Sequence, residues 1–369
     1  MDESCSLSSG DSLQNQLLFV GLLAALGDSA EASVELSGAG ATFPQPFYEQ
    51  AFNAYGAAGR RTVVRYQGVG SGAGTQALLK REVEFAASDV MLSAEEQKRA
   101  GEPLVQIPTC LGAVAIVVNL PGNPEIRLTP EILSAMFLGR ITRWNERTIV
   151  DLNPNAALKA LPITVVHRSD SSGTTFIFTE YLTKTNAIWR ATVGTGREVT
   201  WPTGRQAKGN AGVAGMVHQV PGGIGYVELV YAIGNEMTVV AIQNRTGSFI
   251  IPTPESVSLA AVHLSASSGM SLTDTPEREA YPISAFSWIA LYREQSYGGR
   301  TRARADALVR LLWWLVHDGQ KHASELGYGV LPATAVTRAE TELRSMSYRV
   351  KPILIESPAS ERATSPPMH

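Results

Sequence analysis

The sequence is poor in cysteine, carries no excess of basic residues and contains few long apolar runs. Of its 369 residues two are cysteine, and 31 Lys+Arg face 34 Asp+Glu for a net charge of −3. A disulfide framework is therefore excluded, and a sequence-independent nucleic-acid binder, which needs a basic surface, is not expected. Beyond the N-terminal segment no uncharged apolar stretch approaches the roughly 20 residues that a membrane helix requires.

Histidine is also scarce, and its placement argues against a metal site. The six histidines are scattered, and none lies near a cysteine or carboxylate at a spacing typical of metal ligands. Cys110 lies in the apolar stretch TCLGAVAIVV, which predicts a buried, inert thiol. We therefore expect neither a metal nor a cofactor.

The N-terminus resembles an export signal. Residues 17–26 read LLFVGLLAAL, an apolar run too short to span a bilayer, and the following A-E-A fits a small-x-small cleavage site. Residues 1–32 are thus predicted to be a signal peptide cleaved near Ala32, which places the mature protein in the periplasm. Asp2 and Glu3 depart from the usual positive start of such a signal.

The remaining chain alternates short β-branched runs with helical patterns, beginning with VELSG before PFYEQAFNAY and TVVRYQ before TQALLKREV. This alternation predicts an α/β fold with largely parallel sheets. Thr129 followed by Pro130 marks a helix start. The length suits two domains rather than one core. Residues 357–369 are polar and proline-rich, which predicts a disordered tail.

Three strand-to-helix turns share one chemistry. They read GAGATFPQPF at 38–47, YQGVGSGAGT at 66–75 and VVHRSDSSGTTF at 165–176. Each places glycine, serine or threonine where a helix begins, and there unpaired backbone N–H groups and the helix dipole favour an anion. One such turn is ordinary capping chemistry, but three in one chain favour a shared oxyanion.

Two charged positions sharpen this prediction. Arg168 offers the forked donors that suit phosphate or carboxylate, and its neighbour Asp170 can hold that guanidinium in place. Asp89 ends a strand in EFAASD. An ionised Asp89 can accept a hydrogen bond from the proton that phosphate keeps near neutral pH, but it repels an oxyanion without a proton, such as sulfate.

Two enzyme hypotheses compete with this one. Gly68, Gly70 and Ala73 match G-x-G-x-x-A after a strand, with Asp89 at 89 − 68 = 21 positions beyond Gly68, as in a dinucleotide fold. His167 beside several serines invites a hydrolase interpretation. A lone glycine match is weak evidence, and neighbouring side chains on a strand point to opposite faces, so a catalytic triad within one tight turn is not favoured.

At these residues the sequence resembles the periplasmic phosphate-binding proteins that serve phosphate ABC transporters. The resemblance runs in order through GAGATFPQPFYEQ, YQGVGSG, FAASDVMLS, LTPEILSAMFLGRITRWN, ITVVHRSDSSGTTFIFTEYL, KGNAGVAG and VPGGIGYVE, and it covers nearly the whole mature chain.

The resemblance implies a set of phosphate-binding residues. By position in the family motifs they are Thr42, Phe43 (through its backbone N–H), Ser71, Asp89, Arg168, Ser172, Gly173 and Thr174. Asp170 matches the acid that orients the arginine. No catalytic residue is implied, so an enzyme is not expected.

The resemblance also implies a type II periplasmic binding fold, in which two lobes are joined by two hinge crossovers and the ligand lies in the cleft. Lobe I is expected at 33–108 and 281–356, and lobe II at 109–280. The implied function is binding of inorganic phosphate and its delivery to the permease of an ABC transporter, by a monomer. The alternatives are a binder of another tetrahedral oxyanion and an exported phosphatase.

Overall fold

A computed structural model describes residues 33–262 and 270–355. The predicted signal peptide (1–32) and the predicted tail (357–369) lie outside the described residues. No helix within 33–262 or 270–355 is long and apolar enough to cross a membrane.

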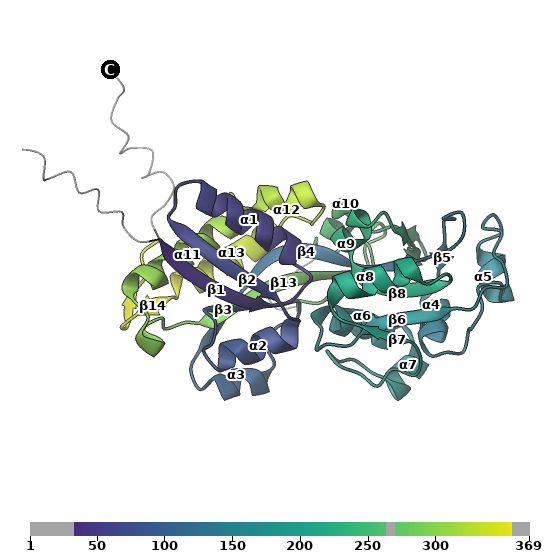
Figure 1. Ribbon diagram of the computed structural model, residues 1–369, viewed down its shortest axis with the longest axis horizontal. Helices are drawn as coiled ribbons and strands as arrows, with labels where there is room; N and C mark the ends of the chain where they lie inside the picture. The colour runs from purple at the N-terminus through teal and green to yellow at the C-terminus, as the bar shows by residue number, and fades with distance from the viewer. Residues whose placement is uncertain (1–32, 263–269, 356–369) are drawn as a thin grey trace, which may run out of the picture. The chain divides into compact units, whose positions relative to one another are not determined.

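Helices and strands alternate along the described chain, as predicted (Figure 1). The strands are β1 (Val34–Gly40), β2 (Thr62–Gly68), β3 (Phe85–Ser88), β4 (Leu104–Val118), β5 (Arg127–Leu128), β6 (Thr164–Arg168), β7 (Arg205–Ala207), β8 (Gly223–Glu228), β9 (Thr238–Val239), β10 (Ala241–Gln243), β11 (Phe249–Ile250), β12 (Leu272–Thr273), β13 (Ile283–Tyr292), β14 (Ser347–Tyr348) and β15 (Lys351–Pro352). The helices are α1 (Gln45–Ala57), α2 (Ser71–Leu79), α3 (Ala94–Ala100), α4 (Pro130–Phe137), α5 (Arg147–Leu152), α6 (Gly173–Thr185), α7 (Ala187–Thr192), α8 (Gly209–Gln219), α9 (Leu229–Gly234), α10 (Pro254–Leu259), the 3-10 turn η1 (Tyr297–Gly299), α11 (Arg302–Val316), α12 (Gln320–Leu326) and α13 (Ala333–Arg344).

Most of the strands join one sheet. Its order is β2-β1-β3-β13-β4-β8-β6-β7, with β12 added to β13 and β9 added to β4. The pairs β1–β2, β1–β3, β6–β7 and β6–β8 are parallel, in line with the βαβ pattern of the sequence. The prediction of largely parallel sheets is wrong for the middle of the sheet, where β13 runs antiparallel to β3 and β4, and β4 runs antiparallel to β8.

The strand β4 links the two parallel groups. Its residues up to Ala113 pair with β13, and those from Val114 onward pair with β8. Figure 1 shows β4 and β13 leading from the β1–β3 group toward the β6–β8 group. β4 is a 15-residue strand that is buried along almost its whole length, so it can pair with a different strand on each half and still belong to the core.

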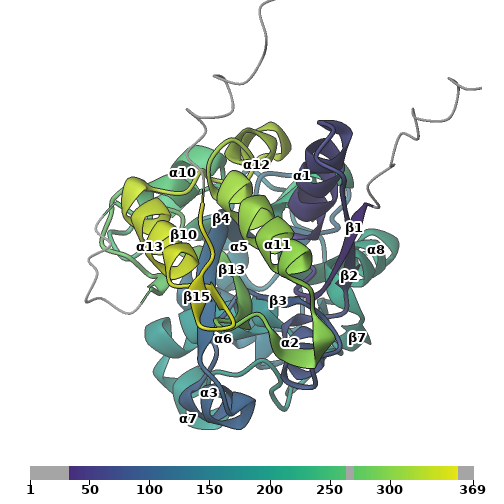
Figure 2. The same ribbon diagram turned by 90° about the vertical axis from the view of Figure 1, so that its left-hand side faces the viewer.

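The helices of the C-terminal part return to the first group. α11 packs against β1 and β4, α12 against α1, and α13 against α11 and β4 (Figure 2). The chain therefore leaves the first group through β4 and comes back to it through β13. Two passages of this kind agree with the expected two-lobe topology, while the lobe boundaries themselves stay a prediction.

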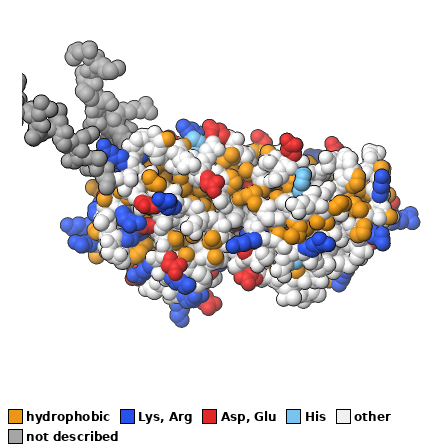
Figure 3. Space-filling model, in the orientation of Figure 1, with side chains coloured by type: hydrophobic (Ala, Val, Ile, Leu, Met, Phe, Trp, Pro, Cys, Tyr) orange, Lys and Arg blue, Asp and Glu red, His pale blue; other side chains and the backbone are white. Residues whose placement is uncertain are grey.

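Two local predictions are confirmed, namely the start of α4 and the burial of Cys110. The side chain of Thr129 accepts a hydrogen bond from the backbone N–H of Ile132 and caps α4, with Pro130 in its first turn. Cys110 is buried and unpaired. On the surface, Figure 3 shows acidic and basic side chains interspersed over one face without a continuous basic stripe.

Candidate anion-binding site

The second and third predicted loops meet each other at the starts of α2 and α6. The backbone N–H of Gly72 donates to the carbonyl of Ser171 at 3.0 Å, and the N–H of Gly173 donates to the hydroxyl of Ser71 at 3.2 Å. A Cβ at Gly72 would overlap Ser171, and one at Gly173 would overlap both Ser71 and Asp89. These glycines therefore let two helix N-termini approach a common point.

The glycines of the 66–75 loop therefore have a structural role that does not depend on a bound dinucleotide. Gly70 adopts a φ of 96°, in the region that glycine favours, and a Cβ on it would lie 2.5 Å from a carboxylate oxygen of Asp170. The loop packs against the 165–176 loop, with Gly72 bonded to Ser171 and Gly70 close to Asp170.

Arg168 lies at the end of β6 and is almost wholly buried, with a side chain that is 1% exposed. Its Nε donates to Asp170 Oδ1 at 2.8 Å and its Nη2 to Asp170 Oδ2, so that the carboxylate holds the guanidinium by two bonds. Asp170 also accepts from the backbone N–H of Gly209 at 3.0 Å. Although burial opposes it, the bonds and charge of Arg168 hold the pKa of Asp170 below its usual range. The ionised form of Asp170 is therefore favoured, and its two bonds hold the guanidinium of Arg168 in place.

The remaining fork of Arg168 points toward a hydroxyl. Its Nη1 donates to Thr174 Oγ1 at 3.2 Å. A second donor to that oxygen is the side-chain amide of Asn210, at 3.5 Å. A hydroxyl has two acceptor lone pairs and one proton, and with both lone pairs engaged the Thr174 proton remains available to an acceptor.

Thr42 shows the same polarity. Its Oγ1 accepts from Asn210 twice, from the backbone N–H at 3.3 Å and from Nδ2 at 2.9 Å. Within 33–262 and 270–355 no acceptor is paired with the protons of the Thr42 and Thr174 hydroxyls. Both side chains are thereby oriented as donors, which is the polarity that an oxyanion needs.

Asp89 is the acceptor on the other side of the site. It follows β3 directly, is buried, and accepts from Ser287 Oγ at 2.6 Å. Burial raises the pKa of Asp89 to about 7, and the bond from Ser287 and the charges of Arg168 and Arg197 limit the rise. The oxygen of Ser71, within reach of this carboxyl, accepts from the Asp89 N–H at 3.4 Å. A carboxyl that titrates near neutrality matches the range in which phosphate exchanges its own proton.

The start of α6 contributes backbone donors. Ser172 is the N-cap, and its hydroxyl accepts from the N–H of Thr175 at 3.1 Å. Its own N–H donates to the carbonyl of Arg197 at 3.0 Å, which secures the loop against the 193–204 segment. The 13-residue helix that begins at Gly173 directs its positive end toward the predicted site.

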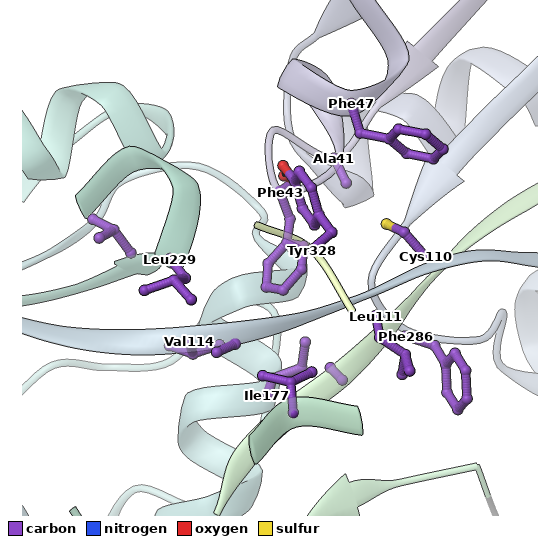
Figure 4. Close-up of a cluster of buried hydrophobic side chains, with 14 of the residues drawn as sticks. Ala41, Phe43, Phe47, Cys110, Leu111, Val114, Ile177, Leu229, Phe286 and Tyr328 are labelled. Carbon is purple, nitrogen blue, oxygen red and sulfur yellow. The ribbon is translucent and has the colours of Figure 1, made fainter. Parts of the chain in front are cut away.

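Phe43 adjoins Thr42 and has its ring in the core. Figure 4 shows it beside Ala41, Phe47 and Tyr328, with Val114, Ile177 and Leu229 nearby in the same buried cluster. The hydroxyl of Tyr328 donates to the carbonyl of Phe43 at 2.7 Å. The side chain thus anchors the 38–47 turn, which leaves the backbone of Phe43 for the ligand contact that the sequence predicts.

Hydrogen bonds join the predicted positions in two groups: Arg168, Asp170, Thr174 and, through Asn210, Thr42 form one, and Ser71, Asp89 and Gly173 form the other. Ser172 and Phe43 adjoin these groups in the chain. Sequence reasoning missed Asn210 and Ser287, which bond to Thr42, Thr174 and Asp89. A signal for Asn210 was present, since KGNAGVAG is another small-residue turn before a helix, and Gly209 has a φ of 68°. Nothing in the sequence around Ser287 indicates its contact, because it lies 198 positions from Asp89.

The contacts of His167 do not place it as the general base that the hydrolase hypothesis needs. His167 stacks on Trp201 with ring centroids 4.7 Å apart, and its Nδ1 lies 3.2 Å from the carbonyl of Arg168. Burial lowers its pKa. Neither contact brings the imidazole to the hydroxyl of Ser172. Within the described parts of the chain no group of three or more His, Cys, Asp or Glu side chains could hold a metal ion.

The chain passes twice between the two groups of strands in this mixed α/β fold, and hydrogen-bond donors line a buried site where helix N-termini face each other. These features define the class of periplasmic substrate-binding proteins. Residues 27–318 match the family model described as a PBP superfamily domain. The phosphate-binding protein PstS of Xylella fastidiosa (strain 9a5c) is 40% identical over 316 residues, covering 84% of each chain. PstS of Pasteurella multocida (strain Pm70) is 37% identical over 317 residues, covering 84% of this chain and 90% of the relative.

The chain belongs to the PstS family of phosphate-binding proteins within the PBP superfamily, so the family resemblance is confirmed. Solved structures agree on the fold. A high affinity periplasmic phosphate-binding protein, PfluDING, solved with phosphate, aligns with a TM-score of 0.67 at 22% identity, over 84% of this chain and 93% of the other. The phosphate-binding protein of Stenotrophomonas maltophilia aligns with a TM-score of 0.65 at 18% identity, over 84% and 94%. The predicted fold class is confirmed.

Proposed function

We propose that this protein binds inorganic phosphate with high affinity outside the cytoplasm and delivers it to the permease of a phosphate ABC transporter. The observation that carries the proposal is the polarity of the site. A buried Arg168, held by Asp170, and hydroxyls oriented as donors accompany a single carboxyl, Asp89, whose pKa is raised to about 7.

Such a site matches partly protonated phosphate. The donors replace the hydrogen bonds that the ion loses on leaving water. Asp89 accepts the bond from the ligand's proton and repels a fully deprotonated oxyanion. The ligand set is Thr42, Phe43, Ser71, Asp89, Arg168, Ser172, Gly173 and Thr174, with Phe43 and Gly173 acting through backbone N–H groups.

The two groups of strands would act as two lobes, with Thr42, Ser71 and Asp89 on one and Arg168 to Thr174 on the other. Phosphate that bridges the lobes stabilises the closed form by its difference in affinity for the two forms. A permease that recognises this form would receive only loaded protein. The relatives named as phosphate-binding proteins support this role over catalysis, and we infer that the protein is not an enzyme.

Export is inferred from the apolar run at 17–26 and the small residues before Ser33. We further propose a monomer that binds no nucleic acid, in keeping with the net charge of −3.

Calorimetric titration tests the proposed ligand. The purified protein, freed of bound phosphate, is titrated with phosphate and then with sulfate at neutral pH. We expect tight one-to-one binding of phosphate and no response to sulfate. Equal binding of both ions would indicate a general oxyanion binder, and silence toward phosphate would refute the proposal.

A further inference from the structure

The side chain of Asn210 lies between the hydroxyls of Thr42 and Thr174. It is fully buried, sits in the first turn of α8, and donates from Nδ2 to Thr42 Oγ1 at 2.9 Å and to Thr174 Oγ1 at 3.5 Å. Thr42 belongs to the turn before α1 and Thr174 to the first turn of α6. Asn210 therefore connects two proposed ligands drawn from different lobes.

The direction of the Asn210 amide is determined by a third contact. Its Oδ1 accepts from the backbone N–H of Glu228 at 3.1 Å. A backbone N–H can only donate, so the amide oxygen must face Glu228 and the NH₂ group must face the two hydroxyls. The reversed amide would place an acceptor against Thr42 and a donor against the Glu228 N–H.

This orientation has a consequence for both hydroxyls. Each hydroxyl oxygen accepts one hydrogen bond from Asn210 Nδ2. Thr42 accepts a second bond from the backbone N–H of Asn210, and Thr174 accepts a second bond from Arg168 Nη1. Both lone pairs of each hydroxyl are then engaged, so each hydroxyl can donate its own hydrogen bond to an anion.

We propose that Asn210 is a positioning residue that sets the donor polarity of Thr42 and Thr174, and so makes phosphate affinity depend on the contact between the two lobes. It acts through these hydroxyls and not by touching phosphate. The inference rests on the proposed function, because it concerns how the same site binds its ligand.

Two substitutions separate polarity from shape. Asn210→Ala removes the donors, and we expect phosphate to bind about 10- to 100-fold more weakly. Asn210→Asp keeps the shape but offers acceptors, which take both hydroxyl protons and add a charge beside the anion. We expect it to bind more weakly still, beyond about 100-fold. Calorimetric titration with phosphate at neutral pH gives both values.

Because Asn210→Asp adds a charge as well as an acceptor, Asn210→Ala and the double-mutant cycle carry the test. Near-parental affinity in Asn210→Ala, or tighter binding by Asn210→Asp than by Asn210→Ala, would overturn the inference. Asn153→Ala is the matched control. Asn153 is also a buried amide with backbone partners, at Arg127 and Ile149, and its loss should lower the melting temperature without changing phosphate affinity.

A double-mutant cycle tests the route through Thr42. If Asn210 acts through that hydroxyl as well as through Thr174, Asn210→Ala should cost less once Thr42→Val is in place, and the double variant should bind at least about threefold tighter than the product of the single losses. Multiplicative losses would contradict the inference. If the parent fails to bind phosphate, the proposed function fails, whereas a binding parent with an unaffected Asn210→Ala variant refutes this inference alone.

Discussion

The ends of β3 and β6 each place an aspartate at the site, and the two behave in opposite ways. Asp170 accepts two bonds from Arg168 and one from Gly209, and its pKa is lowered although burial opposes this. Asp89 is buried with a bond from Ser287 and, within residues 33–262 and 270–355, no ion pair with a cation, and burial raises its pKa to about 7.

The same side chain thus serves two purposes according to its neighbours. A carboxyl paired with a guanidinium has a lowered pKa, and in the proposed site it supports the binding of an anion indirectly, by fixing the donor. A carboxyl that is buried away from that guanidinium has a pKa near neutral pH, and it can accept a hydrogen bond from a protonated ligand. In the proposed site, Asp170 would therefore govern affinity and Asp89 would govern selectivity.

The largest effect should come from Arg168→Ala. It removes a buried charge-assisted contact, and it leaves Asp170 without its partner. We expect phosphate binding to weaken by at least about 1.5 to 3 kcal/mol, or roughly 10- to 150-fold. Titration calorimetry measures the loss, and Arg205→Ala, at an exposed position on neighbouring β7, should leave affinity unchanged. Near-normal affinity without Arg168 would remove the site assignment.

Substitutions of the two aspartates should differ in their effects on phosphate affinity and on the preference for phosphate over sulfate. Asp89→Asn should lower phosphate affinity about tenfold or less, but shrink the preference for phosphate over sulfate by about 100-fold or more, because the repulsion of sulfate disappears. Asp170→Asn should weaken phosphate binding while the preference persists, since it disturbs Arg168 and the Gly209 turn but leaves Asp89 in place. Competition titrations with both ions measure this, and an Asp89→Asn variant that rejects sulfate like the parent would defeat the proton-acceptor role.

The contrast also predicts opposite pH trends in stability. An unfolded aspartate titrates near about pH 3.9. Because the folded pKa of Asp89 is raised to about 7, its contribution is fully present below about pH 4 and is lost as the pH rises toward 7. The lowered pKa of Asp170 gives a contribution that is present above the unfolded pKa and lost as the pH falls through the folded one.

Melting temperatures of ligand-free protein between pH 4 and 7 check the Asp89 trend. Relative to the parent, Asp89→Asn should gain stability steadily as the pH rises, because the buried carboxyl no longer resists ionisation. Asp151→Asn, at an exposed position, should run parallel to the parent. A constant offset for Asp89→Asn across this range would mean that its pKa is not raised.

The smallest effect should come from the ion pair between Arg197 and Glu96. Both side chains are 15% exposed, and Glu96 lies in α3 whereas Arg197 lies in the segment that supports Ser172. We expect Arg197→Ala or Glu96→Gln to weaken phosphate binding by about 0.5 to 1 kcal/mol, because the pair joins the proposed lobes. The exposed pair of Arg147 and Asp151 is the control, and parental affinity and dissociation rate in both variants would exclude a role in closure.

Much of the site could be predicted because its signals are local. The cap at Thr129, the loop of Arg168 and Asp170, and the glycine-rich start of α2 each depend on residues that are neighbours in sequence. Their family pattern placed Thr42 and Asp89 as well. The antiparallel centre of the sheet was not predicted, since β13 and β4 are far apart in the chain and apolar runs of this kind do not specify strand direction.

The sequence by itself determined the α/β class, the three helix starts with their donors, and the identity of the arginine and both aspartates, because capping, turn and charge chemistry act over a few residues. Only the tertiary structure decided that Asn210 orients Thr42 and Thr174, that Ser287 reaches Asp89, and that one aspartate titrates near neutrality. Those properties arise from burial and from contacts between segments far apart in the chain, by 36 positions between Asn210 and Thr174 and by 168 between Asn210 and Thr42, which local chemistry does not encode.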